Sequence, residues 1–248
     1  FDFFRNRVMF PIADHRDRVI AFGGRILNSG EPKYLNSRDT PLFDKRRTLY
    51  NHSRAQKMIR DQNEIIVVEG YMDVIALSRN GFPSSVAPLG TALTDEQIQS
   101  LWKLTEEPVL CFDGDKAGQR AARRAAERTL PLLKPGKSIR FAFLPEGQDP
   151  DSLLTKQGPT ALRTILNATQ PLAEFVWDIE RQASPTDTPE RMAGLKARLR
   201  QQASRIADSA VREQYRNLFD ERTTPQQRNP MRARYGHPPW RRPIESRP

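Results

Sequence analysis

Hydrophobic and polar positions along residues 64–156 predict strands and helices that alternate. Short apolar runs predict four buried strands, at 65–68, 85–87, 109–112 and 138–143. Apolar residues at helical spacing, or a capping pattern such as Thr94-Asp95-Glu96-Gln97, predict three helices between them, at 72–79, 94–104 and 117–130. This order is typical of parallel strands joined by right-handed crossovers. The fold class that we predict is therefore α/β, with a parallel sheet flanked by helices.

The flanking segments follow other patterns. Three short apolar runs within residues 1–60 predict strands, with Gly23-Gly24 as a turn or bulge between two of them. Helical spacing returns between 171 and 219, whereas the segment from 221 onward has no apolar period. We therefore expect four parts, namely a small basic β-rich module (1–60), an α/β domain (61–160), a helical segment (161–220) and a disordered basic tail (221–248).

Charge narrows the kind of partner that we expect. The chain has 248 residues, a formal net charge of +10 and only 37% hydrophobic residues. A strongly basic chain favours a polyanion, and no apolar stretch is long enough to cross a bilayer, so we expect nucleic acid and no membrane. The single cysteine, Cys111, excludes an intrachain disulfide and a multi-cysteine zinc site, and it fits a reducing cytoplasm.

Basic and aromatic residues alternate in the first module. Arg5 and Arg7 follow Phe4, Lys33 precedes Tyr34, and Lys45 follows Phe43 within two residues. A basic surface with aromatic side chains suits a single-stranded nucleic acid whose bases stack on the rings. An ordinary solvated basic face remains the alternative interpretation.

Carboxylates follow three of the predicted strands. They are Glu69, then Asp113 and Asp115, then Asp149 and Asp151. Because the carboxyl ends of parallel strands share one edge of a sheet, we expect these groups to lie together, where they repel one another unless cations separate them. An all-oxygen site suits Mg²⁺ or Mn²⁺ rather than zinc, and two such ions are suited to phosphoryl transfer. Taken singly, each cluster is also explained as a turn or a helix cap.

Several motifs in this order resemble the Toprim domain, and more closely the RNA polymerase domain of bacterial DnaG-type primases. Within the α/β part the resemblance rests on 67–74 (VVEGYMDV), 89–92 (LGTA), 112–118 (FDGDKAG) and 143–151 (FLPEGQDPD). Topoisomerases, some nucleases and recombination proteins share the acidic pattern. The preceding module distinguishes the primases, through 4–12 (FRNRVMFPI), 22–25 (FGGR), 32–37 (PKYLNS) and 43–45 (FDK).

The resemblance implies roles for individual residues. The family's catalytic carboxylates match Glu69, Asp113 and Asp115. The family's metal ligands match the same three residues together with Asp149 and Asp151. Its template- and nucleotide-contacting residues match Arg5, Arg7, Lys33, Asn36 and Lys45.

The implied activity is synthesis of short RNA primers on single-stranded DNA from ribonucleoside triphosphates, by metal-dependent nucleotidyl transfer during bacterial replication. Relative to the family we expect truncation at both ends. We expect this chain to be without the family's zinc-binding domain and helicase-binding domain, and we expect the full-length protein to bind the replicative helicase. Two alternatives stay open, namely a Toprim nuclease or topoisomerase fragment, and a non-catalytic fragment that binds single-stranded nucleic acid.

Overall fold

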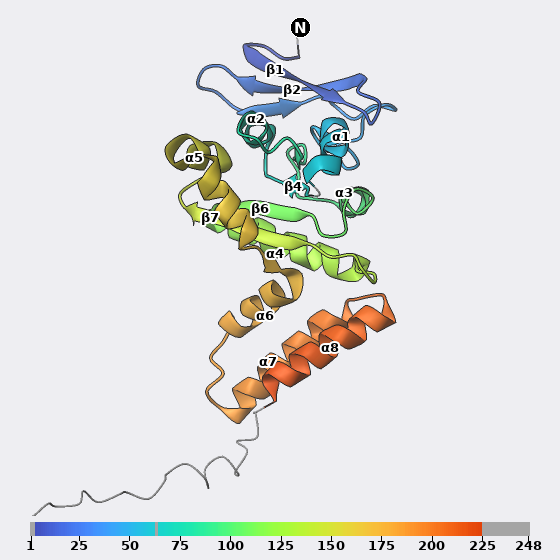
Figure 1. Cartoon of the computed structure of the whole chain (residues 1–248), viewed down its shortest axis with the longest axis vertical. Helices are drawn as coiled ribbons and strands as arrows, with labels where there is room; N and C mark the ends of the chain where they lie inside the picture. Colours follow the sequence, from blue (N-terminus) through green and yellow to red (C-terminus); the bar gives the residue numbers. More distant parts are fainter. Residues whose placement is uncertain (1–2, 63, 225–248) are drawn as a thin grey trace, which may run out of the picture.

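The computed structural model describes residues 3–62 and 64–224, which form a first sheet at one end of the molecule and a second sheet flanked by helices (Figure 1). The first sheet is antiparallel, in the order β1 (Arg7–Ala13), β2 (Val19–Ile26) and β3 (Tyr34–Asn36). The second sheet has the order β5 (Ser85–Val86), β4 (Ile66–Val67), β6 (Val109–Gly114), β7 (Arg140–Glu146) and β8 (Gln170–Pro171). Strands β4 to β7 run parallel, and only the edge strand β8 runs antiparallel. The predicted α/β class with a parallel sheet flanked by helices is confirmed.

The helices of the described residues have the following bounds: α1 (His52–Gln62), α2 (Tyr71–Arg79), α3 (Asp95–Leu101), α4 (Lys116–Thr129), the 3₁₀ turn η1 (Leu130–Leu132), α5 (Pro150–Asn167), α6 (Leu172–Gln182), α7 (Pro189–Ser204) and α8 (Ser209–Thr223). None of the helices in these two ranges has the length and apolar character that a membrane span requires.

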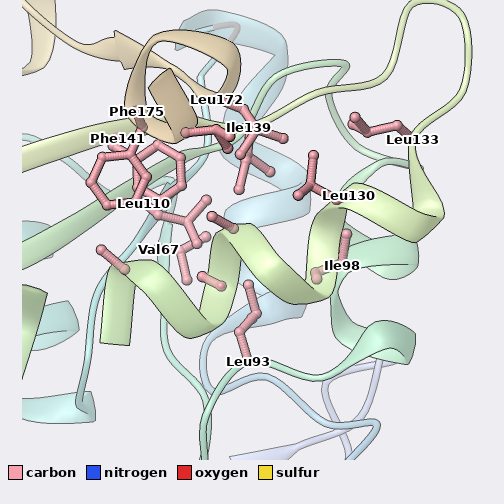
Figure 2. Close-up of a cluster of buried hydrophobic side chains, with 14 of the residues drawn as sticks. Val67, Leu93, Ile98, Leu110, Leu130, Leu133, Ile139, Phe141, Leu172 and Phe175 are labelled. Atoms are coloured by element: carbon pink, nitrogen blue, oxygen red, sulfur yellow. The ribbon is translucent and has the colours of Figure 1, made fainter. Parts of the chain in front are cut away.

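The second sheet is covered on both faces, which explains its continuous apolar strands. In β6, Leu110 and Phe112 join a core cluster with α3, α4 and α6, whereas Val109 and Cys111 join another with α2 and α5. Figure 2 shows the first cluster, in which Phe141 of β7 lies against Phe175 of α6 with ring centroids 4.2 Å apart. Burying one such side chain stabilises the folded state by about 1.5–3 kcal/mol. The packing therefore holds the sheet, and the loops that follow its strands, in a defined position.

One face of the first sheet packs against the α/β domain. A third cluster joins Ile12 and Ala21 of this sheet to Tyr71 at the start of α2, and Figure 1 shows the sheet lying over α2. The prediction of a turn or bulge at Gly23-Gly24 is wrong, because both glycines pair with β1 inside β2. Their lack of side chains serves close packing, since a Cβ on Gly23 would lie 3.2 Å from the Tyr71 ring.

The C-terminal helices form a hairpin of α7 and α8 that Figure 1 shows at the end opposite the first sheet. Residues 221–223, predicted to begin the tail, instead complete α8, and the rest of the predicted tail (225–248) lies outside the described residues. Helix α5 crosses the predicted boundary at 160. It changes direction at Gly158 (φ 76°), directly before Pro159.

Candidate active site

Three strand ends bring the predicted carboxylates to one edge of the sheet. Glu69 follows β4, Asp113 is the penultimate residue of β6, and Asp149 and Asp151 follow β7. These strands are neighbours in the order β4-β6-β7. The sequence-based expectation that the acidic clusters share an edge is therefore met by the topology.

Backbone hydrogen bonds join the loops that carry these groups. The N–H of Gly114 donates to the carbonyl of Gln148 (3.1 Å), and the N–H of Gly147 donates to the carbonyl of Gly114 (3.3 Å). Only glycine fits at 114, because a Cβ there would lie 1.9 Å from the carbonyl oxygen of Pro145. This close crossing holds the loop after β6 against the loop after β7, and so holds Asp113 near Asp149.

The carboxylates face basic and polar side chains of the first sheet across a cavity of about 380 Å³. One wall is acidic and comes from the α/β domain, and it contains Glu69, Asp73, Asp113, Asp149 and Asp151. The opposite wall comes from β2, β3 and the turn between them, and it contains Arg25, Lys33, Tyr34 and Asn36. The cavity thus places cations and hydrogen-bonding groups opposite a concentration of negative charge.

Burial and mutual repulsion change the ionisation of these carboxyls. The pKa of Asp113 is raised to about 7, first by burial and then by the negative charges of Glu69, Asp73, Asp149 and Asp115. Burial and the charge of Asp149 raise the pKa of Asp73 to about 6. The pKa of Glu69 is also raised by loss of surrounding water, although the Asp113 N–H donates a hydrogen bond to its carboxylate and opposes the rise. Carboxyls that repel one another in this way favour a bound cation.

The donor set fits a hard divalent cation that keeps part of its water shell. Among the residues that the structure describes, no three His, Cys, Asp or Glu side chains converge closely enough to enclose a metal ion unaided. Mg²⁺ is commonly held by one or two carboxylates together with water and substrate phosphates. Glu69, Asp113 and Asp149 are the candidates to hold such an ion, because they share the cavity edge and raise one another's affinity for positive charge.

Two of the predicted ligands also have a structural role. Asp115 caps α4 by accepting a hydrogen bond from the Gly118 N–H (2.7 Å), and Asp149 caps α5 by accepting one from the Ser152 N–H (2.7 Å). Asp149 therefore caps a helix and also lines the cavity, and its role as a metal ligand stays a prediction. Asp115 does not line the cavity, and it affects Asp113 and Glu69 through its charge.

The predicted basic contacts divide into two groups. Lys33 and Asn36 line the cavity, whereas Arg5, Arg7 and Lys45 do not. The Arg7 guanidinium donates to the carbonyls of Pro32 (2.7 Å), Gly24 (3.3 Å) and Lys33 (3.4 Å), so it supports the turn that carries Lys33. Lys45 lies in a loop before α1, and its carbonyl accepts a hydrogen bond from Gln97 of α3 (3.1 Å). These placements leave the nucleic-acid roles of Arg5, Arg7 and Lys45 as predictions.

Among the cavity residues that were not predicted as site residues, four have a charged or hydroxyl-bearing side chain. Asp73 lies in the first turn of α2, and its carboxylate accepts a hydrogen bond from the Gly70 N–H (3.1 Å). The available signal was its place three residues after Gly70, where an acidic side chain can reach back to the N-cap N–H of a helix. Arg25, Tyr34 and Tyr71 carry no such signal, because they reach the cavity only through the docking of the first sheet on α2.

A larger cavity of the described residues lies elsewhere. It has a volume of about 650 Å³ and is lined by Val109 and Arg140 at the amino ends of β6 and β7, together with Tyr215 of α8. None of the predicted site residues lines it. Ligands in parallel sheets bind at the carboxyl ends of the strands, so the smaller acidic cavity is the better candidate for chemistry.

Comparisons with known proteins agree with this geometry. Residues 1–56 match a family described as DNA primase catalytic core, N-terminal domain, and residues 63–143 match the Toprim domain family. A curated DNA primase of Pseudomonas aeruginosa is 54% identical over 176 residues, which is 71% of this chain and 26% of that protein.

Solved structures cover more of the chain. The crystal structure of a DNA primase domain from Pseudomonas aeruginosa matches with a TM-score of 0.85 and 47% identity, over 90% of this chain and 70% of that one. A structure described as the DnaG primase catalytic domain bound to ssDNA matches with a TM-score of 0.81 and 41% identity, over 89% of this chain and 71% of that one.

The chain spans about a quarter to a third of the length of its curated relatives, 26% in one and 34% in another. The family matches nevertheless cover the first sheet and residues 63–143 of the α/β domain, and the crystal structure of the Pseudomonas aeruginosa primase domain matches 90% of the chain. The chain belongs to the DnaG-type DNA primases and corresponds to part of their catalytic core.

Proposed function

We propose that this chain is the part of a DNA primase that joins ribonucleotides into short RNA primers on single-stranded DNA. The observation that carries the proposal is the cavity of about 380 Å³, in which carboxylates at three strand ends face cationic and amide side chains of the first sheet. This arrangement suits a reaction between polyanionic substrates, because one wall can hold cations and the other can bind phosphates directly.

The basic wall binds and orients the nucleotide in this proposal. Lys33 and Arg25 attract the triphosphate, and the fixed Asn36 side chain, whose Nδ2 donates to the Leu89 carbonyl (3.1 Å), offers a hydrogen-bonding group beside them. Arg7 acts indirectly, since its hydrogen bonds to Pro32 and Lys33 hold the turn that presents Lys33.

The acidic wall holds Mg²⁺ or Mn²⁺ in this proposal, through Glu69, Asp113 and Asp149, with Asp73 and Asp151 adding negative charge. Such ions, when bound, activate the primer 3′-hydroxyl and stabilise charge on the α-phosphate and the leaving pyrophosphate. The protein holds the three carboxylates at fixed strand ends, so their positions require no rearrangement when substrates arrive. Asp115 acts on this wall through its charge and through the start of α4.

Single-stranded DNA is the proposed template, and the net charge of +10 favours its binding. A relative whose catalytic domain is described as bound to ssDNA supports this substrate. The proposed site of action is the replication fork in the bacterial cytoplasm.

The test is incorporation of labelled ribonucleotides by the chain on a single-stranded DNA template, with Mg²⁺ or Mn²⁺ and with a chelator as control. We expect products that are destroyed by alkali, that need both template and metal, and whose composition follows the template sequence. Cleavage of the template in the same tubes without incorporation would support the nuclease interpretation. Template binding with steep salt dependence, but with neither product, would support the binding-fragment interpretation.

A further inference from the structure

A second cavity lies against Glu69, on the face of the sheet that α4 covers. It has a volume of about 320 Å³ and shares Glu69, Pro88 and Gly90 with the acidic cavity. The rest of its lining comes from α4, from the loop before α3, and from the side of β4 and β6 that packs on α4. None of the described basic residues of the first sheet lines it, so the proposed function leaves this α4 cavity unused.

The floor of the α4 cavity is apolar. Its side chains come from β4, β6, α4 and the loop before α3, and they are Val67, Leu110, Phe112, Ala121, Ala125 and Leu93. Figure 2 shows Val67, Leu93 and Leu110 beside α4. Protein interiors are normally packed without voids, and an apolar void is a ready site for an apolar ligand.

The sequence of α4 explains why this space stays open. A Cβ on Gly118 would lie 2.3 Å from the Asp113 carbonyl oxygen, so the start of the helix already touches the end of β6 and cannot move closer. The helix then faces the floor with Ala121 and Ala125, whose side chains are too short to fill the gap. The cavity therefore follows from a fixed helix start and from small residues behind it.

Two charged side chains stand at the mouth of the cavity. Glu69 and Arg124 are the only charged residues of the described chain that line it. Arg124 is exposed, and within residues 3–62 and 64–224 its guanidinium enters no hydrogen bond or ion pair, although its charge acts on Glu69. Arg124 is thus accessible to a ligand that enters the cavity.

The surroundings of Arg124 favour an anion. Helix α4 has five basic residues and one acidic residue, namely Lys116, Arg120, Arg123, Arg124 and Arg128 against Glu127. A carboxylate that enters from this side meets mostly positive charge, and the guanidinium can donate two parallel hydrogen bonds to it. A cationic ligand would instead pair with Glu69 and be repelled by Arg124, which predicts the opposite order of affinities.

We propose that the α4 cavity binds a small apolar carboxylic acid, whose hydrocarbon body covers the floor and whose carboxylate pairs with Arg124. The inference goes beyond the proposed function and does not depend on it, because binding needs neither a nucleotide nor a template. Since the cavity shares Glu69 and Gly90 with the acidic cavity, the ligand would lie beside the carboxylates at the strand ends. The α4 cavity is therefore a place where a small molecule can regulate the chain.

The size and the lining of the cavity argue against a nucleotide as its occupant. Ligand pockets commonly span about 300–1,000 Å³, so this cavity is suited to a small molecule. A nucleotide would bring ribose hydroxyls against a floor whose side chains offer no hydrogen-bonding partner. A carboxylic acid with a hydrocarbon body has one polar end, which matches the single cation among the described lining residues.

The test is a titration of the chain followed by amide NMR spectra, in a chelator and without nucleic acid. Three ligands share one skeleton and differ in the polar end, namely 3-phenylpropionate, 3-phenylpropionamide and 3-phenylpropylamine. We expect 3-phenylpropionate to bind with a Kd of about 1 mM or below and to shift the signals of Gly90, Ala121 and Ala125. The amide should bind about fivefold more weakly because it loses the ion pair, and the amine should bind more weakly still.

Two variants separate the mouth of the cavity from its floor. Arg124→Gln should bring the affinities for the acid and the amide within about twofold of each other. Ala121→Leu puts a larger side chain into the cavity and should abolish binding of all three ligands, and the helix should persist because leucine is a good helix former. The matched control is Arg123→Gln, which removes a neighbouring cation of α4 outside the cavity lining and should keep the preference of about fivefold.

Four results would overturn the inference. Absence of saturable shifts at the lining residues of the wild type refutes the site, and equal affinities for the acid and the amide refute the ion pair. Tighter binding of the amine makes Glu69 the partner and refutes the class of ligand. An unchanged preference in an Arg124→Gln variant that thermal unfolding shows to be folded refutes the role of Arg124. Each of these results leaves the proposed function intact, because ribonucleotide incorporation is measured separately.

Discussion

Asp113→Asn should stabilise the metal-free chain at neutral pH, and this prediction tests the repulsion among the carboxylates without any assay of activity. The pKa of Asp113 is raised from 3.8 to about 7 in the folded chain. Because the folded state holds this proton more tightly than the unfolded state, its contribution to stability is complete below about pH 4 and is lost as the pH rises through about 7. Asparagine has a similar shape and cannot ionise, so the variant avoids that loss.

The size of the effect follows from the shift. Since a pKa change of one corresponds to about 1.36 kcal/mol, a rise of about three sets an upper limit of about 4 kcal/mol on the gain in the free energy of unfolding. Asp113 is only partly buried, so solvent screening reduces the expected gain to about 1–2 kcal/mol.

Urea unfolding at pH 5 and pH 8, in a chelator and at low salt, measures this gain. The wild type should lose more stability than Asp113→Asn between the two values, and Mg²⁺ should restore the wild type at pH 8 but not the variant. The matched control is Asp187→Asn, which removes an exposed carboxylate paired with Arg191 on α7 and should follow the wild type. If the variant follows the wild-type pH profile, the carboxylates do not repel one another as the cavity implies.

Three further results are expected. Lys33→Ala should weaken Mg²⁺-ATP binding about fivefold or more and flatten its dependence on salt, because Lys33 lines the cavity. An unchanged salt slope in calorimetric titrations would show that Lys33 is an ordinary solvated residue without a role in binding. Gly114→Ala should lower the free energy of urea unfolding by more than about 3 kcal/mol, since its Cβ would lie 1.9 Å from a carbonyl oxygen. Gly194→Ala in α7, where a Cβ would lie 3.7 Å from the Arg198 side chain, should instead raise it by about 0.5–1 kcal/mol, and equal effects of the two variants would refute the close approach at Gly114. Cys111 is 1% exposed and burial raises its pKa to about 12, so a thiol reagent should label it only after unfolding, whereas rapid labelling of the native chain would contradict its place in the core.

Local patterns predicted the parallel sheet because its strands are short apolar runs that are buried on both faces. No tertiary information was needed to predict the strand at 109–112, the helix after Gly118 or the position of acidic residues after strands. The pattern failed at Gly23-Gly24, where absence of a side chain indicates close packing against Tyr71 rather than a turn. It also missed α5, in which two helical stretches meet at a kink at Gly158, directly before Pro159.

The site was predictable on one wall only. Glu69, Asp113, Asp149 and Asp151 follow from strand order, since parallel neighbours end at one edge. The basic wall depends on how the first sheet docks on α2, and this docking rests on contacts such as Phe10 with Tyr71 that lie far apart in the sequence. For that reason Asn36 was named only through resemblance and Lys33 through resemblance and the basic-aromatic pattern, whereas Arg25 and Tyr71 were placed in the site only by the structure.

The central claim is that the carboxylates at the strand ends carry out nucleotidyl transfer. Ribonucleotide incorporation on a single-stranded DNA template, compared between the wild type, Asp113→Asn and Asp187→Asn, tests it most directly. We predict that Asp113→Asn loses at least about a hundredfold in rate while template binding is retained, and that Asp187→Asn keeps the wild-type rate. Unchanged incorporation by Asp113→Asn would contradict the account and place the chemistry outside this cavity.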